Sequence, residues 1–147
     1  MTVFIASDHA GFEAKEACKL FLSDLGISVK DLGPSSFKAN DDYPDYAKKL
    51  CKKVTEKTEH FGVLICGSGI GMSIAANKVP KIRAALCLDT YSAQGARTDD
   101  DANVLILRAR NFDHRRYKAI LKTFFQTPFS EEKRHKRRIA KLESRKR

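Results

Sequence analysis

Five short apolar runs divide the chain, and the segments between them are long enough to form helices. The runs lie at residues 3–6, 27–29, 63–66, 82–87 and 104–107. Most of them are continuously apolar rather than alternating, which is typical of strands that are covered on both faces. Strands that alternate with helices form parallel sheets. The sequence therefore predicts an α/β fold, a Rossmann-like three-layer sandwich with a mainly parallel five-stranded sheet of order 2-1-3-4-5, followed by a C-terminal helical tail.

Three of the segments between these runs carry the periodicity of amphipathic helices. Within residues 14–25, apolar side chains recur three and four positions apart, and Gly26 follows as a C-terminal stop signal. The same spacing recurs within residues 46–54 and 117–125, and Asp113 is the expected N-cap of the last helix. We expect each helix to bury one apolar stripe against the sheet.

The length and composition favour one cytoplasmic domain. A chain of 147 residues with 42% hydrophobic and 31% charged residues is typical of a globular domain with its own core. No apolar run approaches the ~18 residues of a membrane-spanning helix, and the first residues do not resemble a secretion signal. The cysteines include no CxxC pair, so we expect free thiols and no metal site at Cys18, Cys51, Cys66 and Cys87.

The basic charge of the chain is confined to its C-terminal segment. The net charge is +10, and residues 133–147 hold nine Lys and Arg against one acid, which leaves +2 for the rest. We therefore expect residues 1–130 to form the α/β domain, and residues 131–147 to form a basic helix of the same domain that docks on another surface. Nucleic-acid binding through this tail is an alternative, but the segment has no Phe, Tyr or Trp to stack on bases.

An acid and an imidazole follow the first predicted strand. Asp8 and His9 stand at the carboxyl end of that strand, which is where open α/β sheets bind ligands. Asp8 is also a favoured N-cap residue, so one alternative is that it only caps the following helix. Capping does not account for His9, and the pair therefore favours a ligand site.

A cysteine and a run of glycines follow the third predicted strand. In the segment Cys66–Gly71 (CGSGIG), glycine allows backbone N–H groups to approach an anion, and the following helix adds a favourable field. A cysteine at this place would have a stabilised thiolate. Met72 stands where a dinucleotide fingerprint needs its last glycine, and no Walker A lysine follows, which argues against a nucleotide site. A tight turn without a function is the alternative.

The predicted strand order brings these segments together. In the order 2-1-3, the first and third strands are neighbours, so Asp8, His9 and Cys66 open onto one crevice. The tail offers a third element, because Arg134 and Arg138 are four residues apart and share one helical face, where two guanidinium groups suit a phosphate. An ordinary solvated tail is the alternative.

Several segments that follow one another along the chain carry a family resemblance. They are Asp8–Gly11, Asp42–Pro44, Cys66–Lys78, Ile82–Ala84, Tyr91–Gln94, Ala102–Val104 and Arg134–His135. In this order they resemble the type B ribose-5-phosphate isomerases, a family that includes the galactose-6-phosphate isomerase subunits. The resemblance covers essentially the whole chain, and the cysteine loop with its helix is its most specific part.

The resemblance implies an aldose–ketose isomerase that interconverts ribose 5-phosphate and ribulose 5-phosphate through a cis-enediolate, without a cofactor. Cys66 matches the family's catalytic base. The backbone amides of Gly67, Ser68, Gly69 and Gly71 match the anion hole that holds the enediolate. Asp8 matches a family residue that binds a substrate hydroxyl, and the phosphate ligands are matched by His9, Arg134 and Arg138. Further substrate-binding positions are matched by Tyr43, Asn103 and Arg110. The family builds each site across a dimer, which implies a homodimer or a dimer of dimers with the basic tail docked on the partner.

Two positions depart from the family pattern. Asp99 stands where the family has a histidine that helps to open the sugar ring, and Arg108 stands where it has a small residue. We assign Asp99 as a second catalytic position. The departure leaves two alternatives open: an isomerase of another sugar phosphate, tetrose or hexose, and a catalytically weak sugar-phosphate binder. A tetrose 4-phosphate needs no ring opening, because its esterified terminal oxygen cannot close a furanose ring.

Overall fold

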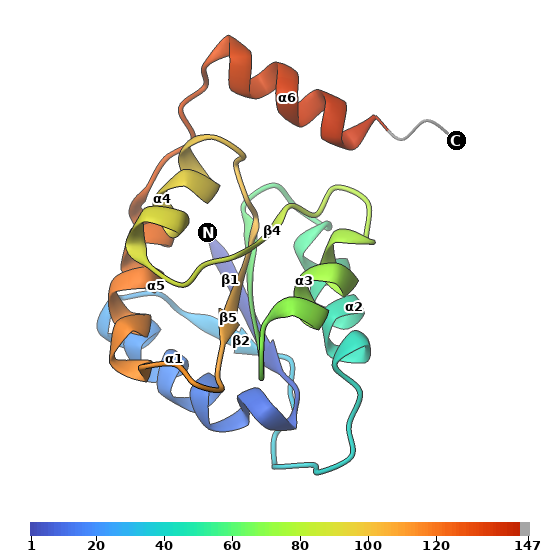
Figure 1. Cartoon of the computed structure of the whole chain (residues 1–147), viewed down its shortest axis with the longest axis vertical. Coiled ribbons are helices and arrows are strands. Elements are labelled where there is room, and N and C mark those ends of the chain that lie inside the picture. The colour runs from blue at the N-terminus through green and yellow to red at the C-terminus, as the bar shows by residue number, and fades with distance from the viewer. Residues whose placement is uncertain (145–147) are drawn as a thin grey trace.

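The structure, a computed structural model, describes residues 1–144 and is built on one five-stranded parallel sheet. The strand order is β2-β1-β3-β5-β4, and every neighbouring pair is parallel (Figure 1). The strands are β1 (Thr2–Ser7), β2 (Val29–Asp31), β3 (His60–Cys66), β4 (Ala84–Leu86) and β5 (Val104–Arg108). The predicted α/β class, its parallel sheet and the pairing of β1 with β3 are confirmed.

The order of the last two strands differs from the predicted 2-1-3-4-5. β5 lies beside β3, and β4 takes the edge of the sheet. In β5, the residues from Val104 to Leu107 are fully buried, whereas the three residues of β4 are only half-buried. The longer and more apolar strand therefore takes the place that is covered on both faces, and the short strand takes the edge.

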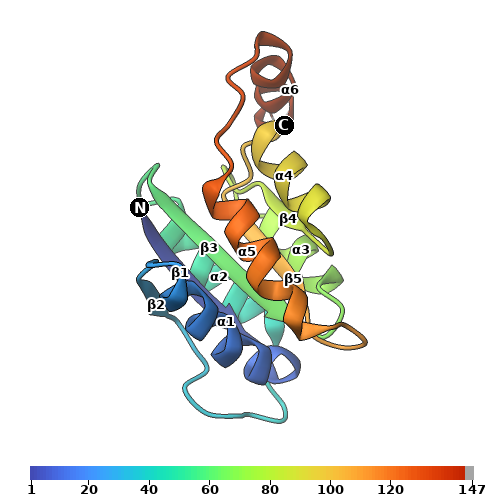
Figure 2. The same ribbon diagram turned by 90° about the vertical axis from the view of Figure 1, so that its left-hand side faces the viewer.

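Two layers of helices enclose the sheet (Figures 1 and 2). One face is covered by α1 (Phe12–Asp24), α4 (Thr90–Thr98) and α5 (Tyr117–Gln126), and the other by α2 (Tyr43–Val54) and α3 (Ile70–Asn77). Alternate residues of the strands supply the two apolar cores, as the pleat of a strand requires. Among residues 1–144, no helix has both the length and the apolar surface to cross a membrane.

The three helices predicted from periodicity are confirmed as α1, α2 and α5. In α1, Ala14, Cys18 and Leu22 are buried at intervals of four residues, which is the predicted stripe. Gly26 follows with φ of +72°, the left-handed conformation of a C-terminal stop. Asp113, the expected N-cap of α5, caps instead the short 3-10 turn that leads into this helix. α5 itself therefore begins one turn later, at Tyr117.

The basic segment forms a further helix, α6 (Lys133–Glu143), which lies beyond the amino edge of the sheet (Figure 1). Of its residues, His135 is buried, and Glu143 makes an ion pair with Arg83 of the body. Most of its other side chains are exposed, so α6 leaves a basic face open. The predicted tail helix extends to Arg147, but residues 145–147 lie outside the described residues. Its docking on a partner stays a prediction.

Candidate active site

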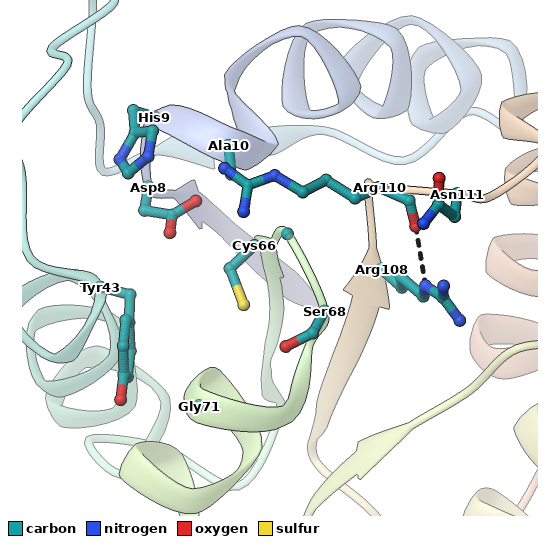
Figure 3. Close-up of a pocket in the computed structure, with 11 residues that line it drawn as sticks. Asp8, His9, Ala10, Tyr43, Cys66, Ser68, Gly71, Arg108, Arg110 and Asn111 are labelled. Atoms are coloured by element: carbon teal, nitrogen blue, oxygen red, sulfur yellow. Dashed lines mark hydrogen bonds between the residues drawn. The ribbon is translucent and has the colours of Figure 1, made fainter.

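A pocket of about 380 Å³ opens at the carboxyl edge of the sheet, between the ends of β1, β3 and β5 and the start of α2 (Figure 3). β1 and β3 are neighbours, but the helices that follow them, α1 and α3, cover opposite faces of the sheet. The pocket lies at this point of divergence, which is the usual ligand position in such folds. Apart from Ala10, Arg108 and Asn111, every lining residue is a predicted site residue: Asp8, His9, Tyr43, Cys66, Gly67, Ser68, Gly71 and Arg110.

Asp8 both caps a turn and lines the pocket. Its Oδ1 accepts a hydrogen bond of 3.1 Å from the backbone N–H of Gly11, in the 3-10 turn that begins at His9. Asp8 therefore caps this turn, and not α1, whose N-cap is Gly11. Capping does not exclude a ligand role, because the carboxylate also faces the pocket near Cys66 (Figure 3). Burial raises the pKa of Asp8, and the hydrogen bond from Gly11 offsets this only in part.

Gly11 allows the turn after β1 to pack closely on β3. A Cβ atom at this position would lie 2.5 Å from the carbonyl oxygen of Ile65. The backbone N–H of Asp8 donates a 3.3 Å hydrogen bond to the same carbonyl. The close approach of the two segments therefore brings the Asp8 carboxylate next to the strand that ends in Cys66.

The thiol of Cys66 lies against the glycine loop. Its Sγ accepts a hydrogen bond of 3.2 Å from the backbone N–H of Gly69. Burial raises the pKa of this thiol, although the backbone N–H groups of Met72 and Gly69 lower it. The amides stabilise the thiolate as the sequence predicts, but burial outweighs them. The thiol therefore holds its proton more firmly than an exposed cysteine does.

The start of α3 supplies further donors beside this thiol. N–H groups in the first turn of a helix have no acceptor within the helix and favour negative charge. Ser68 Oγ accepts a hydrogen bond of 3.1 Å from one of them, the N–H of Ile70. Gly71 faces the ring of Tyr43, and a Cβ atom at this glycine would lie 2.6 Å from the ring. An oxyanion formed beside Cys66 would therefore meet backbone donors at short range.

His9 is held by a carboxylate that the sequence analysis did not single out. Its Nδ1 lies 2.8 Å from Oδ1 of Asp41, and its backbone N–H donates to the same oxygen at 3.0 Å. The two residues are 32 positions apart, and the loop between β2 and α2 brings them together. The one feature of the sequence that could have pointed to Asp41 is the polar triplet Asn40–Asp42, directly before the Tyr43-Pro44 motif.

Two arginines at the end of β5 take different directions. Arg110 crosses the glycine loop, and its Cδ lies 3.1 Å from the place of a Cβ at Gly67. Figure 3 shows its guanidinium group extending past Cys66 toward Asp8. Arg108 Nε donates a hydrogen bond of 2.7 Å to the backbone oxygen of Arg110, and its guanidinium group points away from Cys66 (Figure 3). Arg108 therefore braces the backbone that carries Arg110.

Five predicted site residues do not line this pocket. Gly69 lies beside it in the glycine loop, whereas Asp99, Asn103, Arg134 and Arg138 lie away from it, in the segment before β5 and on α6. The Asn103 side chain is tied to backbone groups of its own chain. Its Oδ1 accepts a hydrogen bond from the N–H of Arg83, and its Nδ2 donates one to the oxygen of Lys81, both at 2.9 Å. Asn103 thus pins the start of β5 to the segment before β4.

Asp99 and Arg134 both lie near a buried histidine, His135. Asp99 Oδ1 is 3.7 Å from Nε2 of His135, and no hydrogen bond within the described residues satisfies this nitrogen. Arg134 is exposed and pairs with Glu132 at 2.6 Å. These groups form a second polar cluster, at the opposite edge of the sheet from Cys66, so a single chain does not unite all the predicted site residues.

The pocket combines groups that exchange protons with donors for an anion. Cys66 and Asp8 can take or give protons, the amides at the start of α3 can hold an oxyanion, and His9 adds a further donor. This set suits proton transfer at a carbon atom next to a carbonyl group. Within the described part of the chain, no three His, Cys, Asp or Glu side chains are grouped to hold a metal ion.

Comparisons with known proteins agree with this chemistry. The sequence pattern of the family described as Ribose/Galactose Isomerase matches residues 3–142. Ribose-5-phosphate isomerase B of Mycolicibacterium paratuberculosis is 37% identical over 139 residues, which cover 95% of this chain and 87% of that protein. The similarity therefore extends over both edges of the sheet and includes α6.

Two solved structures share the fold over nearly its whole length. A ribose 5-phosphate isomerase from Thermotoga maritima is 45% identical, with a TM-score of 0.92 and 98% of each chain covered. Ribose-5-phosphate isomerase B from Mycoplasma genitalium, solved with bound ribulose-5-phosphate, is 41% identical, with a TM-score of 0.92 over 97% of this chain and 93% of that one. Fold and pocket thus define an α/β enzyme of the isomerase class, as predicted. The chain belongs to the ribose/galactose isomerase family.

Proposed function

We propose that this enzyme interconverts ribose 5-phosphate and ribulose 5-phosphate through a cis-enediolate, with Cys66 as the base. The observation that carries the proposal is the Cys66 thiol beside the Gly69 amide, in the pocket that also holds Asp8 and His9. The ribulose-5-phosphate in the Mycoplasma genitalium structure supports the choice of substrate.

In the proposed reaction, the Cys66 thiolate removes the proton from carbon 2 of open-chain ribose 5-phosphate. The electrons of the broken C–H bond form the double bond between carbons 1 and 2, and the aldehyde oxygen becomes an oxyanion. The amides at the start of α3 stabilise this charge as it develops. The thiol then returns its proton to carbon 1, while the proton of the carbon 2 hydroxyl passes to the oxygen on carbon 1. The product is ribulose 5-phosphate.

The lining residues receive roles from their places around the thiol. We assign Asp8 to a substrate hydroxyl, because its carboxylate is turned toward the Cys66 side of the pocket (Figure 3). His9 takes the phosphate at the outer end of the pocket. Arg110 and Tyr43 lie on opposite sides of Cys66 (Figure 3) and fix the sugar chain between them.

We further propose that a second copy of the chain completes each site, in a homodimer or a dimer of dimers. Arg134 and Arg138 are exposed on α6, which projects from the body of its own chain (Figure 2). In a twofold dimer, each α6 reaches the pocket of the partner, and the exchange is reciprocal. The two guanidinium groups then join His9 at the phosphate, and Asp99 approaches the same site.

The chemistry of the cysteines fits a reducing compartment. All four are free thiols, and free thiols are maintained in the cytoplasm. We therefore place the enzyme in the cytoplasm, where ribose 5-phosphate isomerisation belongs to the pentose phosphate pathway.

A tetrose 4-phosphate is a second candidate substrate, and Asp99 is the observation that favours it. The Asp99 side chain is about half exposed beside His135. A carboxylate is a poorer proton donor near neutral pH than an imidazole, so it is less suited to opening a sugar ring. A tetrose 4-phosphate forms no furanose ring and needs no such donor.

A substrate panel tests the proposal. The purified enzyme is assayed for interconversion of aldose and ketose phosphates with four, five and six carbons. We expect the highest kcat/KM with ribose 5-phosphate and ribulose 5-phosphate. Preference for the tetrose pair would select the second candidate. Saturable binding of these compounds without conversion would show a catalytically weak sugar-phosphate binder instead.

A further inference from the structure

The loop between β2 and α2 presents a buried carboxylate, Asp41, to the ring of His9. One oxygen of Asp41 accepts two hydrogen bonds, from the backbone N–H of His9 at 3.0 Å and from its ring Nδ1 at 2.8 Å. The Asp41 side chain is 7% exposed, whereas the His9 side chain is 31% exposed. His9 lines the pocket and Asp41 does not. Asp41 therefore acts on a ligand chiefly through His9, and its charge also helps to raise the pKa of Asp8, another lining residue.

The contact determines which ring nitrogen carries the proton. An ionised carboxylate only accepts hydrogen bonds, so the Nδ1 atom of His9 must be the donor. Burial acts to raise the pKa of Asp41, but the hydrogen bonds from the backbone and ring of His9 outweigh it, and this pKa lies below its ordinary value. Asp41 is thus ionised at neutral pH. Nε2 is the His9 nitrogen that remains for a ligand. It accepts a hydrogen bond when the ring is neutral, and it donates one to a phosphate oxygen when the ring carries both protons.

The loop that carries Asp41 is anchored at its other end. The fully buried Lys15 ammonium donates hydrogen bonds to Asp31 and to the backbone oxygen of Pro34, both at 2.7 Å. Phe37, midway along the loop, lies edge-on to the His9 ring, with 6.3 Å between ring centroids and an interplanar angle of 88°. The ring is therefore held by a carboxylate at Nδ1 and by an aromatic ring at its side.

We propose that Asp41 is a positioning residue that fixes the tautomer and the orientation of His9 in the sugar-phosphate pocket. This inference rests on the proposed role of His9 as a phosphate ligand. Carboxylates fix the rings of histidines that bind metals in a related way. The difference is that a metal takes the lone pair of the opposite nitrogen, whereas a phosphate oxygen needs a proton on it. The competing explanation is that Asp41 only caps the backbone of the 3-10 turn and that the ring contact has no effect on the ligand.

Kinetics and NMR of Asp41→Asn separate these explanations. Asparagine keeps the shape and an acceptor for the backbone N–H, but it removes the charge and can donate to Nδ1. We expect the KM for ribose 5-phosphate to rise about tenfold or more, as for the loss of a charge-assisted contact, with kcat within about twofold of wild type. In long-range ¹H–¹⁵N spectra, the wild-type His9 ring should show the Nδ1–H tautomer, and Asp41→Asn should show a mixture.

Four further variants complete the test, His9→Ala among them. Asp24→Asn is the matched control, because it removes an exposed carboxylate that pairs with Lys118 away from the pocket, and it should change neither readout. The double variant His9→Ala with Asp41→Asn should be no worse than His9→Ala alone, since Asp41 acts through the ring. Asp41→Ala adds a larger perturbation, checked by thermal unfolding.

The outcomes distinguish this inference from the proposed function. An unchanged KM and an unchanged tautomer in Asp41→Asn would overturn the positioning role, as would an Nε2–H tautomer in the wild type. If His9→Ala leaves the KM unchanged, the phosphate role of His9 fails. The tautomer comparison between wild type and Asp41→Asn then still decides whether Asp41 fixes the ring.

Discussion

The Sγ atom of Cys66 lies 3.2 Å from the backbone nitrogen of Gly69, which donates a hydrogen bond to it. Gly69 has φ of +79° and directly precedes α3. A Cβ atom there would lie 2.5 Å from the side chain of Leu86, so only glycine fits both the backbone and the space. One turn of chain therefore supplies both the proposed base and the donors that stabilise the charge it creates.

Replacing Cys66 with alanine should lower isomerisation by ~100-fold to 10,000-fold, because the general base is lost. Turnover of ribose 5-phosphate is compared between purified variants, with thermal unfolding to show that the fold persists. Cys87→Ala is the control, since this thiol is equally buried but lies outside the pocket, and it should keep near wild-type turnover. Equal turnover in both variants would remove Cys66 from the mechanism.

The activity should increase as the pH rises above neutral. Burial raises the pKa of the Cys66 thiol above its ordinary value, so the thiolate is the minor form at pH 7. Below that pKa the thiolate fraction, and with it kcat/KM, should rise about tenfold per pH unit. Alkylation by iodoacetamide should follow the same curve and should slow when substrate is bound. Rapid alkylation at acidic pH, with a flat activity profile, would contradict the raised pKa.

Asp99→His should raise turnover of ribose 5-phosphate, because an imidazole titrates near neutral pH and can protonate a ring oxygen. Turnover of a tetrose 4-phosphate should not gain, since it has no ring to open. Both substrates are assayed with wild type, with Asp99→His and with the control Asp100→His, which alters the neighbouring residue. A lower turnover of ribose 5-phosphate in Asp99→His would mean that Asp99 itself acts in the reaction.

Two inactive variants should restore activity when they are mixed. Cys66→Ala lacks the base, and the double variant Arg134→Ala with Arg138→Ala lacks phosphate contacts worth roughly 1.5 to 3 kcal/mol each. After subunit exchange at equal concentrations, half of the dimers contain one chain of each kind, and each of these has one intact site. About a quarter of the wild-type activity should return. No recovery in dimers shown to exchange would place the complete site within one chain.

Gly11→Ala should destabilise the fold, whereas Gly95→Ala should stabilise it. A Cβ at Gly11 would lie 2.5 Å from the oxygen of Ile65, and such overpacking typically costs about 1 to 3 kcal/mol. A Cβ at Gly95, within α4, would meet no atom within 4 Å, and alanine gains about 0.5 to 1 kcal/mol over glycine in a helix. Urea unfolding measures both, and equal stabilities would contradict the close packing of the turn on β3.

The fold was predictable from the sequence where burial leaves a local pattern. Apolar runs located β1, β3, β4 and β5, and spacing located α1, α2 and α5. The run at residues 27–29 placed β2 two residues too early, because this strand is Val29–Asp31 and ends in exposed polar residues. The order of β4 and β5 in the sheet was not predictable in this way, because both are apolar runs in the sequence. They differ in burial, since β5 is an interior strand and β4 is a half-buried edge strand. α4 was also missed as an amphipathic segment, since it is buried through small side chains such as Ala93 and Ala96.

The site was predictable where a motif follows a strand, as at Asp8 and Cys66. The Asp41–His9 contact spans 32 positions, and no periodicity or local spacing marks a contact between a loop and a distant turn. The effect of burial on the Cys66 thiol was equally hidden, because the helix start favours the thiolate and only the packing around it opposes this.

The length of β5 sets the distance between the two polar clusters. Asn103 stands directly before the strand and Arg108 at its end, and five steps along a parallel strand span roughly 16 to 17 Å. Backbone pairing fixes β5 in register with β3 on one side and β4 on the other, and a slip by one residue would turn its buried side chains to the opposite face. β5 therefore fixes the spacing of the two clusters: an insertion in a surface loop would leave this spacing unchanged, whereas an insertion within β5 would alter it.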